Sequence, residues 1–172
     1  FDHFTLEYLF ISGDSNLRHS TGFVGQLYLI ELPLLLLGLY RLAKRKFRLL
    51  FLALIIIIST IPASFSRTTP HALRTLMSLP VYSILIASGV HYLHSFFKHK
   101  KILSATLGIV LVLGYVLSVS QFWRFYSKVY PTVASTEWQY GYKEMIDTVT
   151  SLKKAHPNTT FFISREYGRP AM

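Results

Sequence analysis

Two polar stretches of the chain carry the side chains best suited to chemistry. The first, residues 12–22, places Asp14, Asn16, Arg18 and His19 close together in a loop bounded by glycines. A carboxylate, an amide, a guanidinium and an imidazole in such a loop favour the binding of a sugar or a phosphate. The alternative is a solvated turn in which Asp14 and Asn16 accept hydrogen bonds from their own backbone.

The second polar stretch, residues 66–74, contains Arg67, His71 and Arg74. Pro70 is typical of the first turn of a helix, with Thr69 as its N-cap. Helical spacing then places His71 and Arg74 on one face. Because a guanidinium forms paired hydrogen bonds to phosphate and stays charged when partly desolvated, the stretch predicts a clamp for a lipid phosphate. The alternative is ordinary contact with lipid headgroups.

Four apolar segments must position these two stretches. The chain has 172 residues, of which 51% are hydrophobic and 15% charged, whereas soluble domains average about 25% charged residues. A helix needs roughly 20 apolar residues to cross a bilayer. The segments 23–40, 49–65, 76–93 and 102–122 therefore predict an all-α polytopic membrane protein with about four transmembrane helices. Glu31 is the one acid inside a predicted span, which is costly unless it faces a cavity or a partner or reaches the interface.

The basic residues predict the orientation of these spans. The chain carries 18 Lys and Arg against 8 Asp and Glu, a net charge of +10, and many of the basic residues lie in two short segments, 41–48 and 98–101. Basic loops stay on the cytoplasmic side, so we expect a multi-pass protein of the plasma (inner) membrane with residues 1–22 and 123–172 outside. Retention of these loops explains the charge without a nucleic-acid partner.

The two outer regions have different predicted structures. Residues 1–22 combine the polar loop with a short interfacial helix, whose apolar side chains are Phe4, Leu6, Leu9, Phe10 and Ile11. Residues 123–172 predict the start of a small α/β domain, with a capping box from Thr136 to Gln139, a helix with an apolar face and a strand at 159–164. The apolar face of that helix contains Met145, Ile146, Val149 and Leu152.

Three stretches taken in order resemble a known enzyme family. Residues 12–22 lead into a leucine-rich span, Pro70-His-Ala-Leu-Arg74 opens the third span, and residues 138–144 read Trp-Gln-Tyr-Gly-Tyr-Lys-Glu. Together they resemble the C-terminal half of bacterial GT-C glycosyltransferases of the dolichyl-phosphate-mannose–protein mannosyltransferase-like group. The resemblance implies a membrane enzyme that transfers a sugar from a polyprenyl-phosphate donor to a glycan, lipid or protein acceptor at the outer membrane face.

The resemblance also implies which residues bind substrate and what lies outside the chain. The substrate-binding candidates are Asp14, Asn16, Arg18, His19, Arg67, His71 and Arg74. The family's catalytic acid belongs to an earlier outer loop, which we expect upstream of residue 1. No catalytic residue is therefore assigned, and the chain is expected to be inactive alone.

The sequence predicts no cofactor. Some relatives use a divalent metal, but in sequence Asp14, His19 and His71 are too sparse a set to predict a metal site. The chain has no cysteine, which excludes disulfides and thiolate zinc ligands. Two other functions stay open: a segment of a transporter or flippase, and a noncatalytic membrane scaffold.

The predicted orientation can be tested by cysteine labelling, because the chain has no native cysteine. Cells expressing Ala43→Cys or Ser135→Cys are treated with a membrane-impermeant maleimide. We expect labelling at position 135 and none at position 43 until the cells are permeabilised. The reverse pattern in intact cells would overturn the topology.

Overall fold

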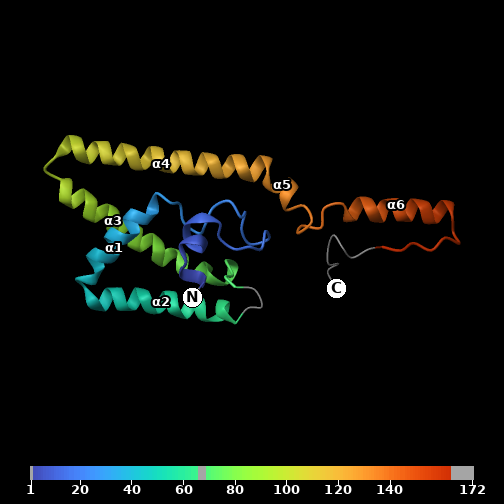
Figure 1. The fold of residues 1–172 in the computed structure, drawn as a ribbon, viewed down its shortest axis with the longest axis horizontal. Coiled ribbons are helices and arrows are strands. Elements are labelled where there is room, and N and C mark those ends of the chain that lie inside the picture. The colour runs from blue at the N-terminus through green and yellow to red at the C-terminus, as the bar shows by residue number, and fades with distance from the viewer. Residues whose placement is uncertain (1, 66–68, 164–172) are drawn as a thin grey trace. The chain divides into compact units, whose positions relative to one another are not determined.

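The computed structural model describes residues 2–65 and 69–163, which form two units, Phe1–Phe125 and Tyr126–Met172, each considered by itself. The first unit begins with two short helices, η1 (Asp2–Phe4) and η2 (Glu7–Ile11), followed by a loop. It continues with α1 (Glu31–Ala43), α2 (Lys46–Ser64), η3 (Leu73–Ser78), α3 (Leu79–Phe97) and α4 (Lys101–Lys128) (Figure 1). The short α5 (Tyr130–Val133) and then α6 (Tyr142–Ala155) follow α4.

Three helical segments of the described chain are long and apolar enough to cross a membrane. They are α2, the continuous helix formed by η3 and α3, and α4, with 19, 25 and 28 residues. Large apolar side chains of these helices, such as Phe51, Ile58 and Val112, are exposed to the surroundings. Exposed apolar surface is unfavourable in water and is tolerated in hydrocarbon. The prediction is therefore confirmed for three segments as far as helical structure, length and apolar composition are concerned.

The first predicted span, residues 23–40, differs from the expectation. Helix α1 begins only at Glu31 and has 13 residues, about 20 Å at 1.5 Å per residue, which is short of a bilayer. The preceding segment pairs with η2 instead, since Gln26 and Leu27 donate backbone hydrogen bonds to Tyr8 and Leu9. Gly25 permits this approach, because a Cβ there would stand 2.3 Å from the Phe10 nitrogen.

The expected interfacial helix at the N-terminus is also revised. Its residues form one turn of 3₁₀-helix and one of π-helix, and Tyr8, Leu9 and Phe10 are buried in the main hydrophobic core. Phe4, Leu6 and Ile11 are exposed. The segment is thus packed into the protein through its buried residues. Its apolar side chains do not form the single exposed face that an interfacial helix needs.

In the second unit, the expected helix is present and the expected strand is not. The amphipathic helix is α6, but it begins after Gly141, whose φ is +91°, so Thr136 is not its N-cap. Residues 159–163, the described part of the predicted strand, form no strand. A strand needs a neighbour to pair with its backbone, and the described residues supply none. An α/β domain is therefore not supported.

The closest helix packing in the first unit is the crossing of α1 and α3. Gly38 and Gly89 meet there: a Cβ on Gly38 would lie 1.9 Å from the Leu85 carbonyl oxygen, and one on Gly89 would lie 1.9 Å from that of Leu34. The absence of side chains lets the two backbones touch, a common arrangement between apolar helices. Leu34, Leu85 and Ile86 form the buried core around the crossing.

We expect Gly38→Ala to destabilise this crossing by roughly 1–3 kcal/mol, because the new methyl group overlaps a backbone carbonyl that cannot rotate away. The matched control is Gly108→Ala in α4, where no atom lies within 4 Å of the added Cβ. That control should be neutral or stabilising by up to about 1 kcal/mol through helix propensity. Unfolding of both variants in detergent, followed by circular dichroism, measures the difference; equal stability would contradict the close crossing.

Candidate functional site

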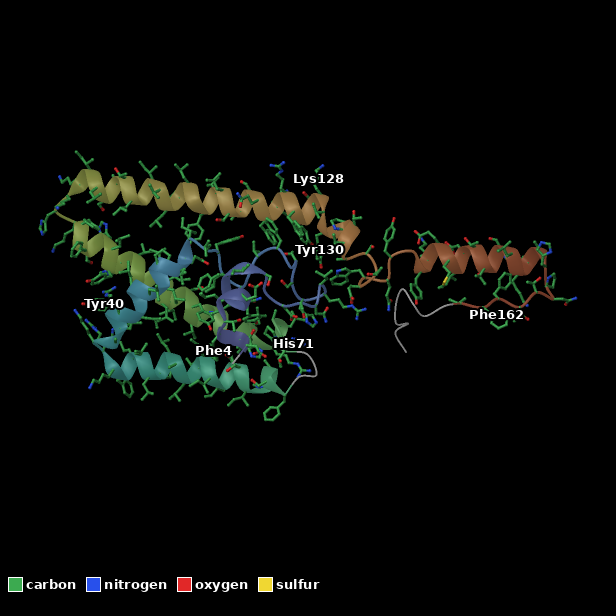
Figure 2. The ribbon with its side chains drawn as sticks, in the orientation of Figure 1. Phe4, Tyr40, His71, Lys128, Tyr130 and Phe162 are labelled. Carbon is green, nitrogen blue, oxygen red and sulfur yellow. The ribbon has the colours of Figure 1, made fainter. Side chains whose placement is uncertain are left out.

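The two polar stretches singled out in the sequence lie against each other. The Asp14 carboxylate accepts a hydrogen bond at Oδ2 from the backbone N–H of Ala72, with a donor–acceptor distance of 2.8 Å. This contact joins positions 58 residues apart. His71, beside it, lies at the opposite end of the first unit from Tyr40 (Figure 2). Because Tyr40 adjoins the basic segment 41–48, the site is at the end of the unit that the topology predicts to be outside.

Asp14 is the anchor of the loop. It is only 1% exposed, and its carboxylate also accepts hydrogen bonds from the Asn16 backbone N–H (2.9 Å) and, at Oδ2, from His19 Nδ1 (3.2 Å). Asn16 makes the same kind of turn, because its Oδ1 accepts a hydrogen bond from the Arg18 backbone N–H, two residues later, at 3.0 Å. The turn in which Asp14 and Asn16 bond their own backbone is therefore present. It also turns Asp14 toward the second stretch.

The second stretch is held by residues near the N-terminus. The His71 backbone N–H donates to His3 Nε2 at 3.1 Å, and the Thr69 hydroxyl donates to Asp2 Oδ2 at 3.0 Å. The expected helix start at Pro70 is wrong: η3 begins at Leu73, and Ala72 precedes it. The backbone N–H groups of His71 and Ala72, which precede η3, are bonded to His3 and Asp14 and are therefore not available to a phosphate.

The imidazoles of His19 and His71 stack on each other. Their ring centroids are 4.3 Å apart and their planes differ by 25°. His71 Nδ1 is buried and has no hydrogen-bond partner among the described residues. Burial lowers the pKa of His71 from its usual value, and the neighbouring His19 and Arg74 lower it further, against an opposing effect of Asp14. The net effect favours the neutral form of the His71 imidazole.

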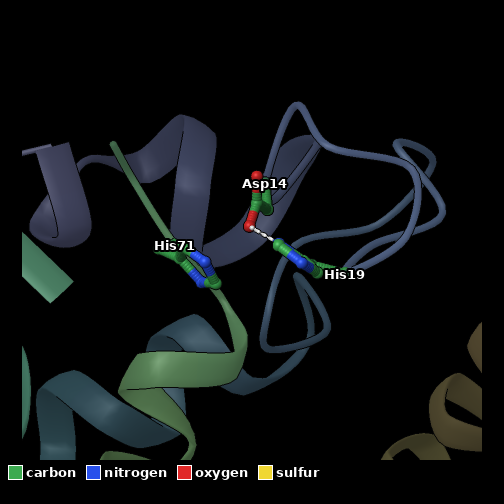
Figure 3. A group of neighbouring side chains, drawn as sticks. All are labelled: Asp14, His19 and His71. Atoms are coloured by element: carbon green, nitrogen blue, oxygen red, sulfur yellow. Dashed lines mark hydrogen bonds and ion pairs between the residues drawn. The ribbon is translucent and has the colours of Figure 1, made fainter. Parts of the chain in front are cut away.

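Asp14, His19 and His71 together form a set of potential metal ligands. Each offers one ligand atom, and these atoms all lie within 4.8 Å of one another. Figure 3 shows the three side chains converging from the loop and from the segment before η3. In the sequence these three residues were too sparse to predict a metal site, because α1 and α2 separate the two stretches along the chain.

The three candidate arginines differ in their surroundings, and only two of them are among the described residues. Arg74 is exposed and donates from Nη1 to the Pro62 carbonyl oxygen at 3.3 Å. Arg18 is exposed in the same loop as Asp14. Arg67 lies outside the described residues. The predicted clamp therefore has one described arginine, Arg74, next to His71.

A cleft around Glu31 is the feature that the site prediction missed. Glu31 Oε1 accepts from the Tyr115 hydroxyl at 2.8 Å, and its Oε2 accepts from the Tyr28 backbone N–H at 2.7 Å. The carboxylate is thus partnered within the protein, as an acid in an apolar segment requires. The cleft has a volume of about 350 Å³ and is lined by Val24, Gly25, Gln26, Leu27, Tyr28, Glu31, Leu79, Ser83 and Phe122. Its signal in the sequence was the single acid of the first apolar segment.

Comparison with known proteins adds no relative: no family model, no curated protein and no solved structure matches the chain.

Asp14→Ala should lower the free energy of unfolding by roughly 3 kcal/mol, because it removes a buried charge and leaves the N–H of Ala72 without its acceptor. Ser15→Ala is the matched control, an exposed neighbour in the same turn that should change stability by less than about 0.5 kcal/mol. Denaturant unfolding in detergent compares the two. Similar values for both variants would show that Asp14 does not anchor the loop.

Proposed function

We propose that this chain forms the part of a membrane-embedded glycosyltransferase that receives a polyprenyl-phosphate sugar donor at the outer membrane face. The proposal joins the resemblance described above to the arrangement of the two polar stretches. The catalytic acid and the acceptor site then belong to other parts of the enzyme. Those parts determine which sugar is transferred and whether the acceptor is a glycan, a lipid or a protein.

The contact between the two stretches is the observation that carries the proposal. Residues 12–22 and 70–74 are two of the three motifs on which the resemblance rests, and Asp14 bonds directly to Ala72. A contact between distant motifs is expected if they serve one substrate. Arg74, three residues after His71, lies in η3 at the start of a helix that is long enough to span a membrane.

The chemistry of the neighbouring groups suits such a donor. Sugar transfer with inversion leaves negative charge on the phosphate, and a fixed cation in a water-poor site stabilises that charge as it develops. We expect Arg74 to supply this cation when the donor is bound. The cleft beside Glu31, with Gln26, Tyr28 and Ser83 in its lining, offers the few polar groups among apolar ones that sugar and lipid binding requires.

Arg74→Ala should reduce sugar transfer about ten-fold or more, because a hydrogen bond to a charged group contributes roughly 1.5–3 kcal/mol. Arg74→Lys should recover only part of this loss, since an ammonium cannot form the paired bonds of a guanidinium. The assay measures transfer from a polyprenyl-phosphate sugar by the enzyme that contains this chain, reconstituted in liposomes.

The matched control for this assay is Arg48→Ala, another exposed arginine, which lies in the basic segment predicted to face the cytoplasm. It should leave transfer unchanged when expression and folding are equal. Unchanged kinetics in both Arg74→Ala and Arg67→Ala would contradict the phosphate clamp. That result would favour a noncatalytic scaffold.

A further inference from the structure

We infer that Asp14, His19 and His71 bind a divalent transition metal ion, with zinc the best match to the ligand set. Three side chains from two separate segments place their ligand atoms within 4.8 Å of one another (Figure 3). Two ligands on one zinc ion stand about 3–4 Å apart, given Zn–N and Zn–O bonds of about 2.0–2.2 Å. The two imidazoles are stacked, so they must turn until their in-plane lone pairs converge on the ion, which brings the set to bonding distance.

The unpartnered nitrogen of His71 is the second observation. Nearly all buried polar groups have a hydrogen-bond partner, and an exception needs an explanation such as a bound ion. His71 Nδ1 is such an exception among the described residues. A neutral imidazole offers a lone pair to a metal, whereas a protonated one does not.

The surroundings of Asp14 resemble the outer shell of a metal site. A ligating carboxylate is oriented by hydrogen bonds from groups that do not touch the metal. The backbone N–H groups of Asn16 and Ala72 already bond Asp14 in this way. His19 Nδ1 lies 3.2 Å from Asp14 Oδ2, so the ion takes the place of the proton between them, and that proton moves to Nε2 or to solvent.

The type of ligand selects the class of metal. Two imidazoles and one carboxylate suit zinc and other transition ions, whereas calcium and magnesium prefer oxygen ligands. Three protein ligands leave a fourth position of a tetrahedral ion open to water or to a small anion. His19 is 16% exposed, so the open position is reachable from outside the protein.

Metal binding can be measured on the whole chain in detergent, purified without a histidine tag and stripped with a chelator. We expect one equivalent of Zn²⁺ per chain in competition with a chromophoric chelator. We also expect Co²⁺ to give the intense visible absorption of a tetrahedral site. The measurement needs no sugar donor, so its outcome is independent of the proposed glycosyltransferase function.

His71→Gln is the decisive variant, because the Nδ1 atom that it removes makes no hydrogen bond that folding would miss. Loss of a direct ligand should weaken zinc binding by more than the 10–100-fold that outer-shell changes cost. The matched control is His94→Gln, a histidine of α3 that bonds Ser104 and lies outside the set. It should bind zinc as the unmodified chain does.

Two results would overturn the metal site: binding of much less than one equivalent by the unmodified chain, or equal affinity in His71→Gln and His94→Gln. Asp14→Asn and His19→Gln extend the test to the other two ligands. If Asp14→Asn fails to fold, His71→Gln still decides, since circular dichroism verifies its helices before zinc is added.

Discussion

The burial of the Asp14 carboxylate is the constraint on which the site depends. A charge removed from water is tolerated only when it is paired or fully hydrogen-bonded. In this chain the bonds come from its own loop through Asn16 and His19, and from the second stretch through Ala72. The carboxylate therefore fixes where the loop ends and where the helical segment of η3 and α3 begins.

The glycine crossing of α1 and α3 provides the frame for that arrangement. Gly38 and Gly89 let the two backbones touch, so α1 packs closely against α3. Helix α1 is held by this contact even though it is too short to cross a bilayer. Segment 23–30 pairs with η2 through backbone hydrogen bonds. The Tyr8 hydroxyl in turn forms a hydrogen bond with the Thr75 hydroxyl, with the two oxygens 2.5 Å apart. The N-terminal segment is thus bonded to the beginning of the same helix that Asp14 caps.

The polar groups of the first unit divide between two centres with different chemistry. Around His71 they are imidazoles and a buried carboxylate, which suit a metal ion. Around Glu31 a carboxylate accepts hydrogen bonds from Tyr28 and Tyr115 in a cleft with a largely apolar lining. Helix α3 connects them, since Leu79 and Ser83 line the cleft a few turns after His71.

The sequence by itself determined the apolar helices and the residue types of the site. Long runs without charge predict α2, α3 and α4, because only a helix satisfies its own backbone in hydrocarbon. The two polar stretches were also visible in the sequence, because each brings several charged or hydrogen-bonding side chains together within about ten residues. The tertiary structure decided the rest. Hydropathy cannot show that segment 23–30 pairs with η2, because leucine is equally apolar in either arrangement. The convergence of Asp14, His19 and His71 depends on how α1 and α2 return the chain to its starting point. That path is set by contacts between distant residues, such as the hydrogen bond from Ala72 to Asp14, which no local pattern encodes.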